Sequence, residues 1–428
     1  MRRSIRALAL GTGVAGAALG LAARTAAPAP AGPAVTVASL EGAPVPGTLA
    51  KIGPDGVRLE GRDAVLPLER IREIAFAARA FPVEAAGTGP RLRVALRGGE
   101  TIRGVFAGGS TDWLEVEAPD VPRVRLPFDS VLRIEAESAR KGPCDDPAQT
   151  FLPRPGNDVA YTKNADAFTG TWIAASPAGV VLESAGKSTT VAWADLVVLH
   201  VDEPPLPRPD RLVAEVETLL GTRLLASEVT GDAERLAVKT RSGLELSLPV
   251  ASVLAVRWSG GAFVYASDLD LKSTFTSWHD DGLVSADFYE RFFGMAVDRT
   301  RLGCPLRVAG TTYRHGIAVN ARSRVEVPLA KGYVRFECRL GVDDSTLAAD
   351  EDKRGDLTAR VLVDGREAWS SQGSVKSGEA ARVVGPVDVA GASTVVLEVD
   401  FGAGLHVNDR ADWVDPILVR AGAPPPSK

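Results

Sequence analysis

Residues 66–74 read Leu-Pro-Leu-Glu-Arg-Ile-Arg-Glu-Ile, and their apolar side chains stand at offsets 0, 2, 5 and 8. A step of two is the period of a strand with one buried face, and the steps of three fit a 3₁₀ turn before the next strand. The spacing recurs along the chain, which indicates an internal repeat of small β units. The quartets are Leu66, Leu68, Ile71 and Ile74; Leu126, Phe128, Val131 and Ile134; Val191, Trp193, Leu196 and Leu199; and Leu248, Val250, Val253 and Val256.

The sequence before each quartet follows a common order of alternating strands and glycine turns. In the second copy, Leu92-x-Val94-x-Leu96 leads to Gly98-Gly99 and then to further short alternating runs. Alternation with period two predicts strands with one buried face, and turn glycines between short strands predict a meander. We expect each copy to form a small barrel, similar in architecture to SH3-like and Sm-like barrels but without an Sm-type RNA-binding signature. Such small barrels are marginal alone, so neighbouring copies should pack together.

After residue 264 the sequence changes to longer alternating strands. Val334, Phe336, Cys338 and Leu340 alternate with charged residues, and no long segment has helical periodicity. The predicted fold class is all-β, with four small SH3-like barrel repeats followed by a galactose-binding-like β-sandwich. The predicted segments are a signal peptide (1–31), barrel repeats (35–78, 91–137, 157–202 and 210–258), the sandwich (264–420) and a disordered tail (421–428), and Pro-rich joints separate the barrels.

The sandwich segment carries an ordered set of Gly, Asp, Tyr, His and Trp motifs. They include Tyr265-x-Ser267-Asp268, Tyr313-x-His315-Gly316-Ile317-x-x-Asn320, Gly341-Val342-Asp343-Asp344 and Asp409-x-x-Asp412-Trp413. The set resembles the NPCBM family of carbohydrate-binding modules, which is associated with glycoside hydrolases of family 98. This resemblance implies a galactose-binding-like sandwich that binds a sugar, of a galactose type, through its loops.

A sugar site needs aromatic faces for C–H surfaces and planar polar side chains for hydroxyl groups. The candidates are Trp278, His279, Tyr313, His315, Asn320, Asp409 and Trp413, and we expect Tyr313, His315, Asn320 and Trp413 to converge at one end of the sandwich. In the family, a His usually stands at the place of Asn320 and a Lys at the place of His315. For Trp413 the alternative is burial in the core, where Trp is usually found.

An acidic loop begins at Asp343 and Asp344 and continues to Asp352. Its carboxylates offer the hard oxygen ligands that Ca²⁺ prefers, although the loop lacks EF-hand spacing. The alternative is an ordinary solvated loop. No other cofactor is expected.

The three cysteines, Cys144, Cys304 and Cys338, show neither CxxC nor Cys/His metal spacing. A Cys304–Cys338 disulfide is possible in an oxidising compartment, and two buried thiols are the alternative.

The N-terminus has the features of a secretory signal peptide. Arg2, Arg3 and Arg6 precede an apolar stretch, and Ala29-Pro30-Ala31 offers a cleavage site before Gly32. An uncleaved anchor is the alternative, although the stretch is short for a membrane span. We therefore expect export to the periplasm, the cell surface or the medium.

The net charge and the absence of certain motifs argue against several classes of function. A net charge of −5 without a basic patch argues against nucleic-acid binding and against a general anionic-membrane binder. The chain contains no GxSxG, HExxH or P-loop motif, no GxGxxG motif that follows a predicted strand, and no segment typical of a catalytic barrel. The prediction is an exported, non-catalytic glycan binder or envelope scaffold whose barrels act as spacers or bind a protein partner. The alternatives are a glycoside hydrolase or its accessory subunit, and a structural interaction protein whose sandwich no longer binds sugar.

Overall fold

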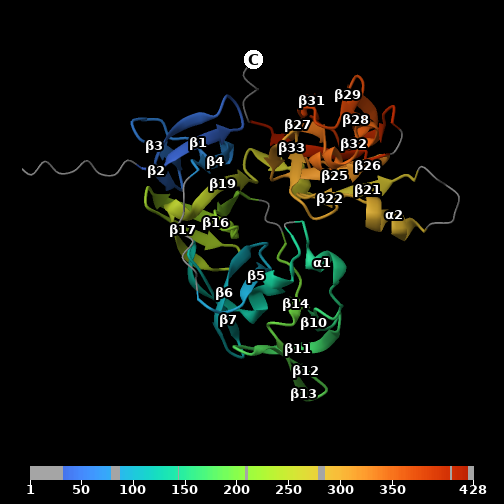
Figure 1. Ribbon diagram of the computed structural model, residues 1–428. Helices are drawn as coiled ribbons and strands as arrows, with labels where there is room; N and C mark the ends of the chain where they lie inside the picture. Colours follow the sequence, from blue (N-terminus) through green and yellow to red (C-terminus); the bar gives the residue numbers. More distant parts are fainter. Residues whose placement is uncertain are drawn as a thin grey trace, which may run out of the picture. The chain divides into compact units, whose positions relative to one another are not determined.

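The computed structural model describes residues 32–78, 87–142, 144–207, 211–277, 285–404 and 407–422 (Figure 1). Strands make up most of the regular structure in these ranges, so the all-β prediction is confirmed. Within them, no helix is long and apolar enough to cross a membrane. The predicted signal peptide, the end of the predicted tail, Trp278 and His279 lie outside the described residues.

The first part of the chain forms successive antiparallel meanders in which the last strand returns to pair with the first. Their strands are β1 (Ala34–Ser39), β2 (Val45–Gly53), β3 (Gly56–Leu59) and β4 (Ile71–Phe76); β5 (Arg91–Leu96), β6 (Thr101–Gly109), β7 (Trp113–Ala118), β8 (Val121–Pro127) and β9 (Val131–Ala136); β10 (Asp158–Thr162), β11 (Ala167–Ser176), β12 (Gly179–Ser184), β13 (Lys187–Ala192) and β14 (Leu196–His200); and β15 (Val213–Thr218), β16 (Arg223–Asp232), β17 (Arg235–Thr240), β18 (Glu245–Pro249) and β19 (Val253–Ser259).

The quartets occupy equivalent positions in these meanders. The first member faces a residue of the third strand, and the fourth member faces a residue of the first strand. The register shifts at the third member in every copy, where the chain leaves the turn. Three copies have the expected 3₁₀ turn, η1 (Leu68–Arg70), η2 (Phe128–Ser130) and η4 (Val250–Ser252), and the third copy has a hydrogen-bonded turn instead.

Burial follows this register. The third and fourth quartet members are all at most 1% exposed, and Leu126, Val191 and Leu248 are buried as predicted. Leu66 differs, because it is only half-buried. The residues before Leu66 form no strand, and a single bridge joins it to Val57, so its side chain is covered on one side.

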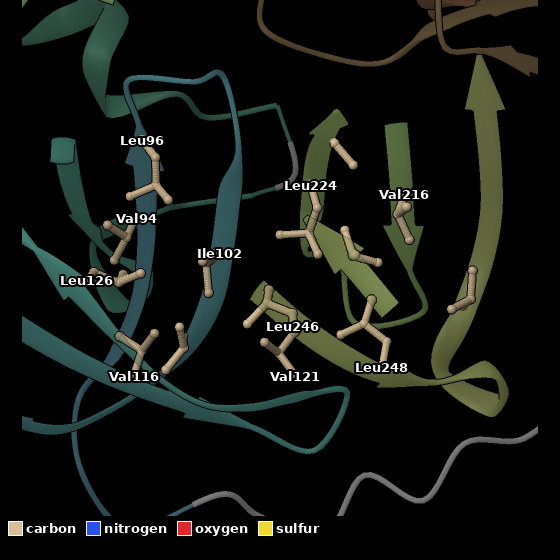
Figure 2. Close-up of a cluster of buried hydrophobic side chains, with 14 of the residues drawn as sticks. Val94, Leu96, Ile102, Val116, Val121, Leu126, Val216, Leu224, Leu246 and Leu248 are labelled. Atoms are coloured by element: carbon tan, nitrogen blue, oxygen red, sulfur yellow. The ribbon is translucent and has the colours of Figure 1, made fainter. Parts of the chain in front are cut away.

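The meanders pair with one another and share one hydrophobic core. β4 pairs with β19, β9 pairs with β14, and β16 pairs with short stretches of β2 and β6. Figure 2 shows Val121 of β8 beside Leu246 of β18, where the second and fourth segments meet. The description of each segment as an SH3-like barrel, and their number, stay predictions.

The second part of the chain is a sandwich of two antiparallel sheets. The first sheet has the order β22 (Ala296–Val297), β25 (Gly316–Asn320), β33 (Arg410–Arg420), β27 (Tyr333–Val342) and β31 (Arg382–Asp388), with β20 (Phe263–Tyr265) also on β33. The second has the order β21 (Lys272–Phe275), β26 (Ser323–Pro328), β32 (Thr394–Phe401), β28 (Asp356–Val363) and β29 (Arg366–Ser370), with β30 (Val375–Lys376) on β28. A hairpin, β23 (Leu306–Val308) and β24 (Thr311–Tyr313), stands apart.

Short helical elements complete the chain. The α-helices are α1 (Pro147–Thr150) and α2 (Ala286–Phe293), and the remaining 3₁₀ turns are η3 (Glu137–Ala139), η5 (Ala266–Asp268), η6 (Asp344–Ala348) and η7 (Glu351–Lys353). The side chain of Ser285 caps the first turn of α2 by accepting a hydrogen bond from the Phe288 amide. Along the chain, α2 comes shortly before β22, the first strand in the order of the first sheet.

The cysteine prediction is wrong for Cys304. Cys144 and Cys304 form a disulfide, and Cys338 is the free thiol among the three cysteines, all of which lie in the described ranges. Cys338 lies on β27 with its side chain buried in the core of the sandwich. The partner of Cys304 comes instead from the segment before α1, far away in sequence.

Candidate functional site

A groove lies at one end of the sandwich, where β25 ends and β33 begins. Asn320 pairs with Arg410 across these two strands, and Val342, the last residue of β27, pairs with Ala411. The ends of β25 and β27 and the start of β33 therefore lie together at the same end of the first sheet. The groove is lined by Phe292, Phe293, Thr300, Arg301, Leu302, Ala318, Val319, Asn320, Ala321, Asp343, Ser345, Asn408, Asp409, Arg410 and Asp412.

One wall of the groove is apolar and comes from α2 and the segment after it. The side chains of Phe292 and Leu302 are 52% and 59% exposed, which is unusual for such large apolar groups. Phe293 is held in place by stacking on Phe275 of β21, with ring centroids 5.3 Å apart. The helix therefore presents an anchored aromatic surface to the solvent beside the polar strand ends.

The rest of the lining is mostly polar and comes from the strand ends and η6. The Asn320 side-chain amide donates a hydrogen bond of 3.3 Å to the Phe293 carbonyl, which ties β25 to the end of α2. The Arg410 guanidinium donates a hydrogen bond of 2.9 Å to the Ser345 hydroxyl, which ties β33 to η6. Carboxamide, guanidinium and hydroxyl groups are thus fixed side by side along one face.

Two buried carboxyl groups, Asp409 and Asp412, also line the groove. Asp409 is 3% exposed, and its Oδ1 accepts a hydrogen bond of 2.8 Å from the Asp356 amide, while its Oδ2 has no hydrogen-bond partner among the described residues. Burial, helped by the charge of Asp356, raises the pKa of Asp409 to about 7. Burial and the neighbouring Asp343 raise the pKa of Asp412 well above its usual value.

The substitution Asp409→Asn tests the raised pKa of Asp409 through the pH dependence of stability. The pKa of Asp409 is about 7 in the folded protein and roughly 4 in an unfolded chain. Between these values the folded protein keeps a proton that the unfolded chain has released, so stability falls as the pH rises through this range. Asp409→Asn should remove that fall and raise the free energy of unfolding by about 1–2 kcal/mol at pH 8. Urea titrations of both proteins at pH 5 and pH 8 measure the difference, and parallel pH profiles would contradict the assignment.

Of the sequence-predicted sugar ligands, the structure brings Asn320 and Asp409 together in the groove. Tyr313 and His315 do not lie there, because His315 precedes the first residue of β25 and Asn320 is its last. Five residues of extended chain separate the two by roughly 16 Å. The expected convergence of these residues at one end of the sandwich is therefore wrong.

Trp413 is a core residue. It is 0% exposed and lies on β33 opposite Ile317, with its ring packed edge-on against Trp369 at 6.4 Å. No face of the indole is open to a sugar. The alternative of burial is therefore the correct one for this residue.

The predicted calcium ligands, Asp343 and Asp344, accept hydrogen bonds from backbone amides of nearby loops instead. Asp343 Oδ1 accepts a hydrogen bond from the Ser345 amide at 3.0 Å and caps η6. Both oxygens of Asp344 accept hydrogen bonds of 2.8 Å, from the amides of Ala309 and Gly310. Because backbone amides already occupy these oxygens, the structure gives no support to calcium at Asp343 and Asp344.

His315 has a different environment from the groove residues. Its ring stacks on Tyr265 with centroids 3.7 Å apart, and it is 8% exposed. Burial lowers its pKa, but the Asp298 carboxylate, with a smaller contribution from Glu215, outweighs burial and raises the pKa. Tyr313 lies on β24 and packs against the small apolar cluster around Leu306 and Val308.

Sequence reasoning missed Phe292, Leu302 and Arg410. Phe288 and Phe292 are spaced four residues apart, which places them on one face of a helix, and this was the available signal for α2. Arg410 lies within the Asp409-x-x-Asp412 motif itself, but the motif does not show which of its members open into a groove.

Two packed antiparallel sheets with a groove of polar strand ends and one aromatic wall define a β-sandwich of the binding-module type. Residues 263–419 match the model of the NPCBM/NEW2 domain, so this part of the chain is a domain of that carbohydrate-binding-module family. The resemblance inferred from the motifs is thereby confirmed for the sandwich. No curated protein matches the chain.

Several solved structures are similar to the chain. A CBM51 module from Clostridium perfringens GH95, solved with methyl-galactose, is 21% identical, with 37% of this chain and 99% of that chain covered and a TM-score of 0.30. A structure of CBM51-2 with GlcNAc and INT domains from Clostridium perfringens ZmpB is 19% identical, covering 46% and 38%, with a TM-score of 0.31. The tandem CBM51 modules of Sp3GH98 from Streptococcus pneumoniae SP3-BS71 are 12% identical, covering 87% and 88%, with a TM-score of 0.31.

Proposed function

We propose that the chain is a glycan-binding protein and that the groove at the end of β25 and β33 is its sugar site. The observation that carries the proposal is the pairing of the exposed Phe292 ring with the fixed polar side chains of Asn320 and Arg410 in one groove. A sugar ring offers an apolar C–H face and an edge of hydroxyl groups, and the Phe292 ring and the polar side chains match those two surfaces. The family of the domain supports the same class of ligand.

The proposed ligand is a terminal galactose-type sugar, bound with modest affinity. Hydroxyl groups exchange water hydrogen bonds for protein hydrogen bonds at little net gain per bond, so selectivity should exceed strength. Asp409 also lines the groove, with its Oδ2 lacking a hydrogen-bond partner among the described residues, and it is suited to accept a hydroxyl donor once ionised.

A glycan array probed with the purified chain tests the proposal. Wild-type protein should bind a small set of galactose-terminated glycans, and Phe292→Ala should weaken that binding by about tenfold, since stacking contributes about 1–1.5 kcal/mol. Val383→Ala is the control, because it removes another exposed apolar side chain of the sandwich that does not line the groove. Equal losses in both variants, or an array without binding, would favour a structural scaffold instead.

A second candidate function is glycoside hydrolysis, with Asp409 as general acid. A pKa of about 7 suits a carboxyl group that donates a proton at neutral pH. Such chemistry needs a second carboxylate across the bond, and Asp343 lines the same groove. Turnover of a chromogenic galactoside by the wild type and its loss in Asp409→Asn would support this function.

The proposed site of action is outside the cytoplasm, with cleavage before Gly32, and the meanders serve as a spacer or as a docking surface for another protein. The N-terminal sequence supports export, and a disulfide such as Cys144–Cys304 is typical of oxidising compartments. Intact-mass analysis of the protein from its native cells should show a mature chain that begins at or near Gly32. A chain that keeps Met1 in the cytoplasm would refute the export proposal without affecting the sugar site.

A further inference from the structure

Three side chains that commonly bind metal ions converge in the sandwich, away from the groove. Asp268 ends η5, Asp298 follows β22, and His315 precedes β25. One potential ligand atom from each lies within 4.8 Å of the other two, and the described residues contain no other such group of three. None of the three lines the proposed sugar groove.

The backbone fixes Asp298 beside His315. The Asp298 amide donates a hydrogen bond of 2.8 Å to the Gly316 carbonyl, and Asp298 Oδ1 accepts one of 3.0 Å from the Gly316 amide. Asp298 also has a φ of 56°, a left-handed conformation that non-glycine residues seldom adopt. A conformation of this kind persists only where its surroundings enforce it, and it is found more often at functional sites.

The imidazole of His315 supplies the second observation. The ring is 8% exposed and stacked on Tyr265, and its Nδ1 has no hydrogen-bond partner among the described residues. Nδ1 faces Asp298 Oδ1 at 3.7 Å, which is beyond hydrogen-bond distance. Leaving a buried ring nitrogen without a hydrogen-bond partner is unfavourable, and a cation between the two atoms would give Nδ1 a partner.

The separation of these two atoms fits a small divalent cation. Tetrahedral Zn²⁺ with bonds of about 2.0–2.1 Å places its ligand atoms roughly 3.4 Å apart. The Nδ1–Oδ1 separation of 3.7 Å is close to that value, and Asp268 needs a modest side-chain movement to complete the set.

We propose that Asp268, Asp298 and His315 bind one divalent transition-metal ion, with Zn²⁺ as the preferred cation. An imidazole nitrogen with two carboxylate oxygens suits Zn²⁺ better than Ca²⁺, which takes oxygen ligands. Three protein ligands leave a fourth position for water. The ion joins η5, the segment after β22 and the start of β25, and it does not depend on sugar binding.

Titration of the tag-free full chain with ZnCl₂ after removal of metals by a chelator tests the site. Isothermal titration calorimetry should show one Zn²⁺ per chain, and Zn²⁺ should raise the midpoint of thermal unfolding. His315→Lys keeps a cation beside the two carboxylates but removes the ligand, so a variant with wild-type circular dichroism should bind Zn²⁺ at least tenfold more weakly. Asp268→Asn should show the same loss.

His200→Gln is the matched control. His200 is also a buried histidine, and its Nε2 is already hydrogen-bonded to the Phe151 carbonyl at 2.7 Å, so this variant should keep the wild-type stoichiometry and affinity. The proposal is overturned if the wild type binds no Zn²⁺, if folded His315→Lys binds it as tightly as the wild type, or if the chain binds Ca²⁺ in preference to Zn²⁺.

Discussion

Trp413→Ala is expected to lower the free energy of unfolding of the sandwich by about 3–5 kcal/mol, the range for a large aromatic side chain removed from a packed core. The indole is fully buried on β33, the strand that pairs with both β25 and β27. Its ring also packs edge-on against Trp369 between the sheets. The cavity therefore opens at the centre of the domain, where the structure can relax least.

Hydrogen exchange of peptides from residues 263–419 measures this effect separately from the rest of the chain. Trp113→Ala is a suitable control, because Trp113 is half-buried on β7 and lies under the Arg125 guanidinium outside the sandwich. It should leave exchange in the sandwich unchanged. A loss below about 1 kcal/mol in Trp413→Ala would mean that the indole is not a core residue.

Removal of the Cys144–Cys304 disulfide is expected to lower the free energy of unfolding by up to about 5 kcal/mol, because the loop it closes is long. The cysteines are separated by 160 residues, so the bridge restricts a large part of the unfolded chain. Cys144→Ser/Cys304→Ser should show this loss, and dithiothreitol should bring the wild type to the same stability without affecting the double variant.

Cys338→Ala is the control for the disulfide. It removes the free, buried thiol of β27 and should cost only about 1 kcal/mol for a small cavity, with the response to dithiothreitol kept. A thiol titration of the denatured, unreduced wild type should find a single free thiol. Three free thiols, or a stability that dithiothreitol does not change, would contradict the bridge.

The part of the fold that the sequence predicted is the part governed by local periodicity. The apolar offsets placed Ile74, Ile134, Leu199 and Val256 on buried strands because period-two alternation depends on neighbouring residues alone. The half-burial of Leu66 depends on whether the residues before it form a strand, and the quartet pattern does not contain that information. The Cys144–Cys304 contact depends on how distant segments of the chain meet, and local sequence patterns contain no information about it.

The residues of the candidate site were also predicted only in part. Motif order identified Asn320 and Asp409 as members of the loop end of the sandwich, and both line the groove. Motif order did not show that His315 and Asn320 stand at opposite ends of one short strand, or that Trp413 points into the core. Phe292 was missed because α2 lies in a segment that was expected to contain only strands.

Titration calorimetry of the full chain with a galactose-terminated oligosaccharide decides whether the groove binds sugar. The wild type should show saturable one-to-one binding. Asn320→Ala should weaken it by about tenfold, and Asn164→Ala, an exposed asparagine between β10 and β11, should not change it. If both variants bind as the wild type does, the groove is not the sugar site. If the wild type binds no galactoside and the array finds no other glycan, the chain is not a glycan-binding protein.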